Sequence, residues 1–91
     1  MRIYKYTFSG IENAEFEMPK GAEILCVQIQ SHLAVTAICL WALVDSLEAR
    51  VERRRFMVIG TGHELYGVRN VKYVGTVQEP PFVWHIFEVL P

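Results

Sequence analysis

The chain contains few cysteines, and their placement argues against a fold that depends on disulfide bonds or on a bound metal. Only Cys26 and Cys39 are present among 91 residues, and no second pair exists to complete a zinc site. Both lie within apolar segments, where a reduced, buried thiol is more common than a disulfide. We therefore expect neither a bound metal nor a cofactor.

Long apolar runs are also lacking. The longest, residues 33–44, is interrupted by Thr36 and is shorter than the roughly 20 residues that a membrane-spanning helix needs. The N-terminal residues alternate between polar and apolar types and do not show the charged start, apolar centre and cleavage site of an export signal. These features predict a cytoplasmic protein with no membrane partner.

An excess of charge of one sign is missing as well. Nine basic and ten acidic residues give a formal net charge of −1. A general attraction to a nucleic-acid polymer is therefore not expected, because such binding depends on a strongly positive surface. Any site for an anion must be local.

What the chain does have is apolar material. Hydrophobic residues make up 52% and aromatic residues 12% of the sequence, which is far from the composition of disordered chains. A chain of this length can bury one core without staples, and no internal repeat or linker divides it. We expect a single domain over residues 1–91.

Alternating or continuously apolar segments separated by short turns predict an all-β fold. Segment 37–44 is apolar on both faces, so it should be a central strand. Segments 2–8 and 14–18 are expected to pair as a hairpin, and residues 64–66 offer at most one short helical turn. The pattern favours a small antiparallel sandwich or open barrel. The expected strands are residues 2–8, 14–18, 23–30, 37–44, 53–59, 72–78 and 82–89.

The last expected strand is largely apolar on both faces, with Phe82, Trp84 and Ile86 on one and Val83, His85 and Phe87 on the other. A sheet in so small a protein needs only one face for the core. The second apolar face, together with Trp41 and Trp84, therefore predicts a homo-oligomer or a ligand surface. Core packing is the competing explanation for each tryptophan.

Three consecutive arginines precede the most distinctive turn of the chain. On a strand, Arg54 must point away from Arg53 and Arg55, so the three cannot form one cationic patch. They could bind an anion through their forked donors. The alternative is a solvated edge strand whose arginines pair with Glu48 and Glu52.

The turn itself combines glycine with an imidazole, in the order Gly60, Thr61, Gly62 and His63. Glycines let backbone N–H groups converge on an oxyanion, which is a known way to hold phosphate. They can equally provide the positive φ that a tight turn requires. His63 is the strongest single candidate because it lies in a loop.

Five segments of the chain are distinctive: MPKGA at 18–22, LWALVD at 40–45, GTGH at 60–63, YVGTVQ at 73–78 and FVWHIFE at 82–88. In their order they resemble a family of small bacteriophage and prophage proteins of unassigned function. The resemblance covers most of the chain, although residues 47–51 depart from the family pattern. It implies an accessory role, and phages encode small oligomeric β-proteins that capture the nucleotide signals of bacterial immunity.

These considerations lead to one hypothesis for function. The chain is expected to be a non-enzymatic phage accessory protein that sequesters a small anionic ligand, with a cyclic oligonucleotide or an ADP-ribose derivative as the leading class. Such a ligand needs aromatic faces, cationic forks or backbone N–H groups, and polar groups for its hydroxyls. The candidate ligand-binding residues are Trp41, Arg54, Arg55, Gly60, Thr61, Gly62, His63, Tyr66, Gln78, Trp84 and His85.

Two other functions remain open. One is a structural or interaction module that forms a homo-oligomer or binds a host protein through the apolar second face. The other is a phosphoesterase, which would require His63 and His85 to meet across a cleft. No nucleophile, base and orienting acid can be named from spacing, so we do not expect an enzyme.

Overall fold

Seven β-strands make up the protein in a computed structural model that describes all residues, 1–91. They confirm the all-β prediction, and residues 64–66 form no helical turn. No helix is present that is long and apolar enough to cross a membrane. The strands are β1 (Arg2–Thr7), β2 (Ala14–Pro19), β3 (Glu23–His32), β4 (Val35–Val44), β5 (Val51–Gly60), β6 (Val71–Glu79) and β7 (Phe82–Val89).

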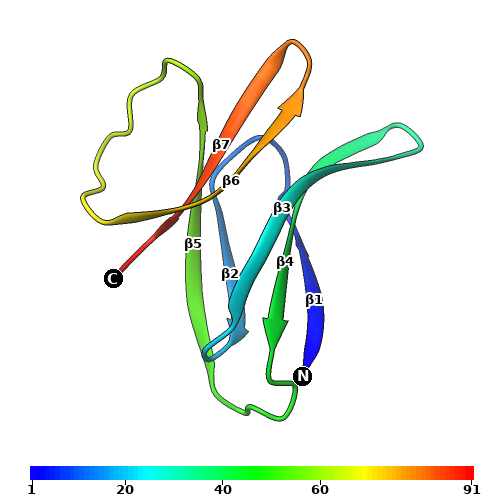
Figure 1. Ribbon diagram of the computed structural model, residues 1–91, viewed down its shortest axis with the longest axis vertical. Helices are drawn as coiled ribbons and strands as arrows, with labels where there is room; N and C mark the ends of the chain where they lie inside the picture. Colours follow the sequence, from blue (N-terminus) through cyan, green and yellow to red (C-terminus); the bar gives the residue numbers. More distant parts are fainter.

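The strands form two antiparallel sheets, ordered β1-β4-β3 and β2-β5-β7-β6, which pack as a small sandwich and do not close into a barrel (Figure 1). The hairpin expected between residues 2–8 and 14–18 is therefore wrong, because β1 pairs with β4 and β2 pairs with β5. Each of these strands has one apolar face. Placing them in different sheets lets both faces meet in the core, where the rings of Tyr6 and Phe16 lie 5.4 Å apart.

Strand β4 is the centre of the three-stranded sheet, as its sequence predicts. On its inner face Ile38, Leu40, Ala42 and Val44 are completely buried. They pack with apolar side chains of the other sheet, such as Phe56, in one continuous core. Alternate side chains of β4 thus point into the core, and those between them lie on the outer face of the sheet.

The two sheets approach each other most closely along β3 and β6. Gly75 lies at an irregularity of β6, where the register with β7 shifts. A Cβ atom at this position would lie 2.7 Å from Cγ1 of Val27 in β3. Glycine is needed here because any side chain would separate the sheets or displace Val27.

A polar link between the two sheets lies near this contact, since Glu88 is two residues from Ile86, the register partner of Gly75. Arg54 on β5 donates to both carboxylate oxygens of Glu88 on β7, with Nη2 3.0 Å from Oε1. Its Nη1 also donates to the carbonyl oxygen of Ala22, 2.8 Å away, just before β3. These hydrogen bonds with Glu88 raise the pKa of Arg54 above its ordinary value. Arg54 thus joins the two sheets.

The β3–β4 and β6–β7 hairpins diverge at one end of the molecule (Figure 1). The molecule is flat, with extents of 41 × 37 × 17 Å. Phe82, the first residue of β7, is 54% exposed. This end of the four-stranded sheet is where the glycine turn lies.

Candidate functional site

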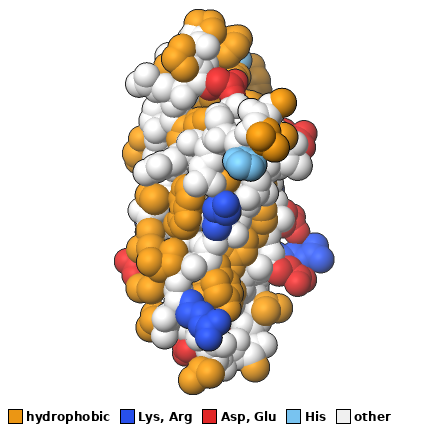
Figure 2. All heavy atoms as spheres, turned by 90° about the vertical axis from the view of Figure 1, so that its right-hand side faces the viewer, with side chains coloured by type: hydrophobic (Ala, Val, Ile, Leu, Met, Phe, Trp, Pro, Cys, Tyr) orange, Lys and Arg blue, Asp and Glu red, His pale blue; other side chains and the backbone are white.

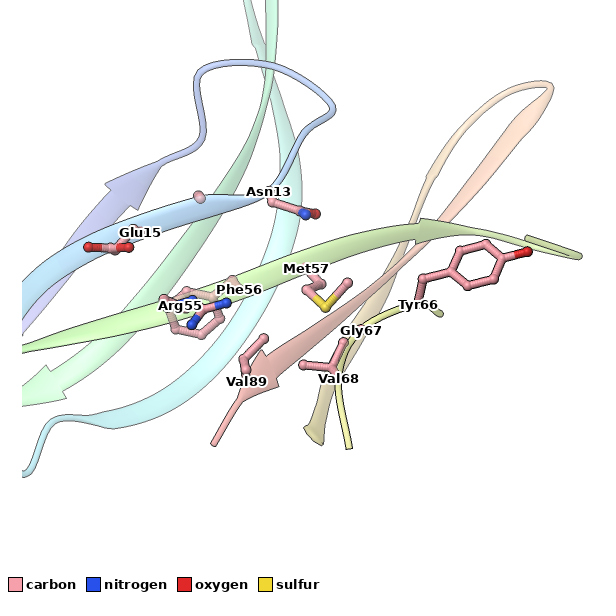
Figure 3. A pocket seen from close by; sticks show the side chains of 10 residues that line it. Asn13, Glu15, Arg55, Phe56, Met57, Tyr66, Gly67, Val68 and Val89 are labelled. Atoms are coloured by element: carbon pink, nitrogen blue, oxygen red, sulfur yellow. The ribbon is translucent and has the colours of Figure 1, made fainter. Parts of the chain in front are cut away.

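A pocket of about 350 Å³ opens on the outer face of the four-stranded sheet, where the β5–β6 loop passes beside β5 and β7 (Figure 3). We call it the arginine pocket. Strand β5 supplies Arg55 and Met57, the segment before β2 supplies Asn13, and the loop supplies Tyr66 and Val68. Three separate parts of the chain therefore converge on one opening.

The arginine run divides between the faces of β5 as the alternation predicts. Arg53 binds Glu15 at 2.9 Å and lies 3.9 Å from Glu17, whereas Arg55 makes no ion pair. Arg55 stands opposite Glu15 in the register, but that carboxylate accepts from Arg53. Arg55 is thus the one guanidinium of the run with its donors free, and it is exposed.

The interpretation of this run as a solvated edge strand is wrong. Strand β5 is an inner strand, because it pairs with β2 on one side and with β7 on the other. Glu48 pairs with Arg50 instead of with the run, and Glu52 contacts Arg54 at 3.4 Å. The other acidic partners of Arg53 and Arg54 come from the neighbouring strands β2 and β7.

Asn13 and Tyr66 complete the polar part of the arginine pocket. The side-chain oxygen of Asn13 accepts the backbone N–H of Val58 at 3.0 Å, which fixes the amide and leaves its NH₂ group as a donor. Tyr66 is 79% exposed beside Gly67, whose φ of +73° turns the loop back (Figure 3). A cation, an amide donor and an aromatic ring thus surround an apolar floor that includes Met57.

A second pocket, also of about 350 Å³, lies at the end of β5 and β7. We call it the aromatic pocket; Gly60, Thr61, His63, Phe82 and Trp84 contribute to its lining. The rings of Phe82 and Trp84 stack with centroids 5.6 Å apart and planes inclined by 24°. The indole Nε1 of Trp84 is buried and has no acceptor.

Gly60 explains how His63 reaches this pocket. A Cβ atom on residue 60 would lie 2.9 Å from Nδ1 of His63 and 3.2 Å from Cζ3 of Trp84. Because Gly60 has no side chain, the imidazole of His63 can pack against the backbone of residue 60 beside the indole of Trp84. The glycine is required for this close approach, whereas its value for binding phosphate is a separate question.

The glycine turn uses most of its N–H groups internally. Thr61 donates its N–H to the carbonyl of Val83 at 3.4 Å, and His63 donates to the carbonyl of Gly60 at 3.0 Å. Gly62, with φ of +86°, is the residue of this turn whose N–H stays free. The turn therefore presents one free donor and not a converging set of N–H groups, and the positive φ of Gly62 agrees with the alternative use of glycine in a tight turn.

His85 belongs to a chain of hydrogen bonds on the outer face of the sheet. Its Nε2 lies 2.7 Å from Oγ1 of Thr61, and its Nδ1 lies 3.0 Å from Oγ1 of Thr76. Thr76 in turn lies 2.5 Å from the hydroxyl of Tyr73. His63 packs over the inner side of Gly60, so the two imidazoles occupy opposite faces of the β5–β7 pair and do not meet across a cleft.

The remaining candidates lie apart from both pockets. Trp41 is on the outer face of the three-stranded sheet, opposite Lys5 and Cys26 in the register. Gln78 is exposed near the end of β6, and Arg54 is held by Glu88. The arginine pocket brings together Arg55 and Tyr66, and the aromatic pocket brings together Gly60, Thr61, His63 and Trp84, with Gly62 in the same turn and His85 bound to Thr61.

Sequence reasoning missed several residues that line the pockets. Asn13, Met57 and Val68, which line the arginine pocket, are not among the candidates that the sequence indicates. Their shared pocket depends on contacts between distant segments, such as Asn13 with Val58. For Phe82, the available signal in the sequence is its position as the first residue of the expected strand 82–89.

A comparison with protein families matches the whole chain, residues 1–91, to a domain of unknown function, DUF7352. The chain belongs to this family. No curated protein and no solved structure matches it. No group of three or more His, Cys, Asp or Glu side chains is placed to hold a metal ion. The chemistry of the two pockets is therefore what indicates a function.

Proposed function

We propose that the protein binds a small anionic ligand of the nucleotide class in the arginine pocket and sequesters it without cleaving it. The observation that carries the proposal is the free guanidinium of Arg55 in one pocket with the exposed ring of Tyr66. A nucleotide offers a flat base and an anionic group, which match an aromatic face and forked N–H donors. Asn13 adds a donor beside Arg55.

The polar groups of the arginine pocket support binding over catalysis. No serine, threonine, cysteine or histidine lines it. Its one carboxylate, Glu15, accepts a hydrogen bond from Arg53 at 2.9 Å. A nucleophile with a neighbouring base is therefore missing, and an intact ligand is the expected occupant.

The resemblance to phage proteins supports a biological setting for this binding. A captured signal of bacterial immunity, either a cyclic oligonucleotide or an ADP-ribose derivative, fits the proposed chemistry. In that setting the protein acts in the host cytoplasm and counters antiviral defence by lowering the concentration of free signal. Sequestration requires tight binding and slow release but no chemical step.

Calorimetric titration with a panel of cyclic oligonucleotides and ADP-ribose derivatives tests the proposal. We expect saturable binding, recovery of unchanged ligand after denaturation, and about a 10- to 150-fold weaker affinity in Arg55→Gln, since hydrogen bonds to charged groups contribute about 1.5–3 kcal/mol. Arg53→Gln is the matched control, because Arg53 lies on the same face but is already paired. Absence of binding across the panel, or recovery of a cleaved product, would contradict the proposal.

A second candidate function is a homo-oligomeric interaction module, and exposed apolar side chains on the outer face of the three-stranded sheet favour it. Ile3 is 60% exposed and Val35 66% exposed on this face, beside the half-buried Trp41. On the side where β1 and the β3–β4 hairpin lie, Figure 2 shows hydrophobic side chains interrupted by basic side chains and histidine. Light scattering of the native protein and of Ile3→Lys tests this function by measuring the molar mass in solution. If this face is the interface between subunits, the native protein should be an oligomer and Ile3→Lys should dissociate it.

A further inference from the structure

The aromatic pocket is separate from the arginine pocket. Arg55 points to the outer face of the sheet, whereas Trp84 pairs with Gly60 on the inner face. Residues 55 and 60 are also roughly 17 Å apart along an extended strand. The two pockets can therefore be occupied independently.

We infer that the aromatic pocket binds an uncharged planar ring of the nucleobase class. This inference does not depend on the anion site. The lining contains no Lys, Arg, Asp or Glu, so no group is present to neutralise a charged ligand. A neutral ring loses little hydration when it enters such a pocket.

Stacked side chains provide the surface for this ring. One face of Phe82 lies against Trp84, with ring centroids 5.6 Å apart, while Phe82 is 54% exposed. The imidazole of His63 reaches the same pocket because Gly60 has no side chain in its way. Three planar groups thus border the space, and flat aromatic ligands bind best between or upon such groups.

His63 supplies the polar contact that distinguishes a nucleobase from a plain hydrocarbon ring. Its imidazole lines the pocket beside Trp84, and its ring nitrogens make no hydrogen bond within the chain. They therefore keep capacity for an amino or carbonyl group at the edge of a base. The hydroxyl of Thr61 is not available for this contact, because it is held by His85 on the outer face of the sheet.

Titration with adenosine, guanosine, cytidine and uridine in a Trp41→Phe background tests the inference, because Trp84 is then the sole tryptophan. We expect saturable quenching of its fluorescence by at least one nucleoside. Phe82→Leu should weaken binding about 5- to 150-fold by removing the stacking ring. Gly60→Ala should weaken it as well, since its methyl group would push His63 from the pocket. Circular dichroism checks that each variant stays folded.

Two controls separate this inference from the anion-binding proposal. Tyr66→Ala and Arg55→Gln alter the arginine pocket alone and should leave nucleoside binding unchanged. Inorganic pyrophosphate should respond in the opposite way, with sensitivity to Arg55→Gln and none to Phe82→Leu. Absence of quenching, quenching unaffected by Phe82→Leu, or preferential binding of N-acetyltryptophanamide, which represents a protein side chain, would overturn the inference.

Discussion

Among single residues, Glu48 shows how a local contact controls a charge. The side chain of Arg50 donates to its carboxylate at 2.8 Å, and the backbone N–H of Arg50 donates at 2.9 Å. These hydrogen bonds lower the pKa of Glu48 from its ordinary 4.5 to about 2. The pair lies in the β4–β5 link, away from both pockets.

We predict that Arg50→Gln raises the pKa of Glu48 toward its ordinary value, because the larger cause of the depression is removed. The backbone N–H remains, so the return is incomplete. Since the folded-state pKa is the lower one, the contact stabilises the native state above about pH 4.5 and this contribution disappears as the pH falls toward 2. A carbon-detected NMR titration of the carboxylate measures both values, and an unchanged pKa in the variant would refute the assignment to Arg50.

The residues also show what alternation can and cannot predict. Period-two spacing correctly separates Arg54 from its two neighbours, because successive side chains on a strand point to opposite faces. Which arginine stays free is decided elsewhere, by Glu15 on β2 and Glu88 on β7. These partners lie 38 and 34 residues away from the arginines that they bind, so no local pattern identifies them.

For whole elements, the extents of the strands were largely predictable and their partners were not. All seven expected segments are strands, since their periodicity is strong and turn residues separate them. Partner choice failed for β1 and β2, where the short link between them resembles a hairpin turn but crosses between the sheets. Sheet packing overrode the local signal.

One element-scale prediction concerns Gly75, where β6 meets β3. Gly75→Ala should lower the free energy of unfolding by about 1–3 kcal/mol, because the new methyl group would lie 2.7 Å from Cγ1 of Val27. Urea denaturation measures the loss. Val27→Ala removes the Cγ1 atom that the new methyl group would contact. The double variant should therefore lose less free energy of unfolding than the sum of the losses in the two single variants. Additive losses would show that the close approach does not limit the packing of the sheets.

At the scale of the whole molecule, the two sheets meet at an apolar core and at one polar link. In the core, the contact between the rings of Tyr6 and Phe16 and the contact of Gly75 with Val27 require the two sheets to lie close together. The polar link requires Arg54 on β5, Glu88 on β7 and the carbonyl group of Ala22 just before β3. Glu88 is 6% exposed and is the one buried charged residue. A buried charge that loses its partner is costly, even where the intact pair adds little net stability.

The last prediction follows from that asymmetry. Glu88→Gln should lower the free energy of unfolding by about 3 kcal/mol, because it leaves Arg54 largely buried with Glu52, 3.4 Å away, as its remaining acidic partner. Glu15→Gln removes a carboxylate from an exposed pair on the same sheet and should cost only about 0.2–1 kcal/mol. Urea denaturation of both variants gives the comparison. Equal losses would mean that Arg54 joins the sheets no more strongly than a surface ion pair does. A large loss confined to Glu88→Gln would show that the link helps to hold the two sheets together. It would also explain why Arg54, unlike Arg55, is unavailable to a ligand.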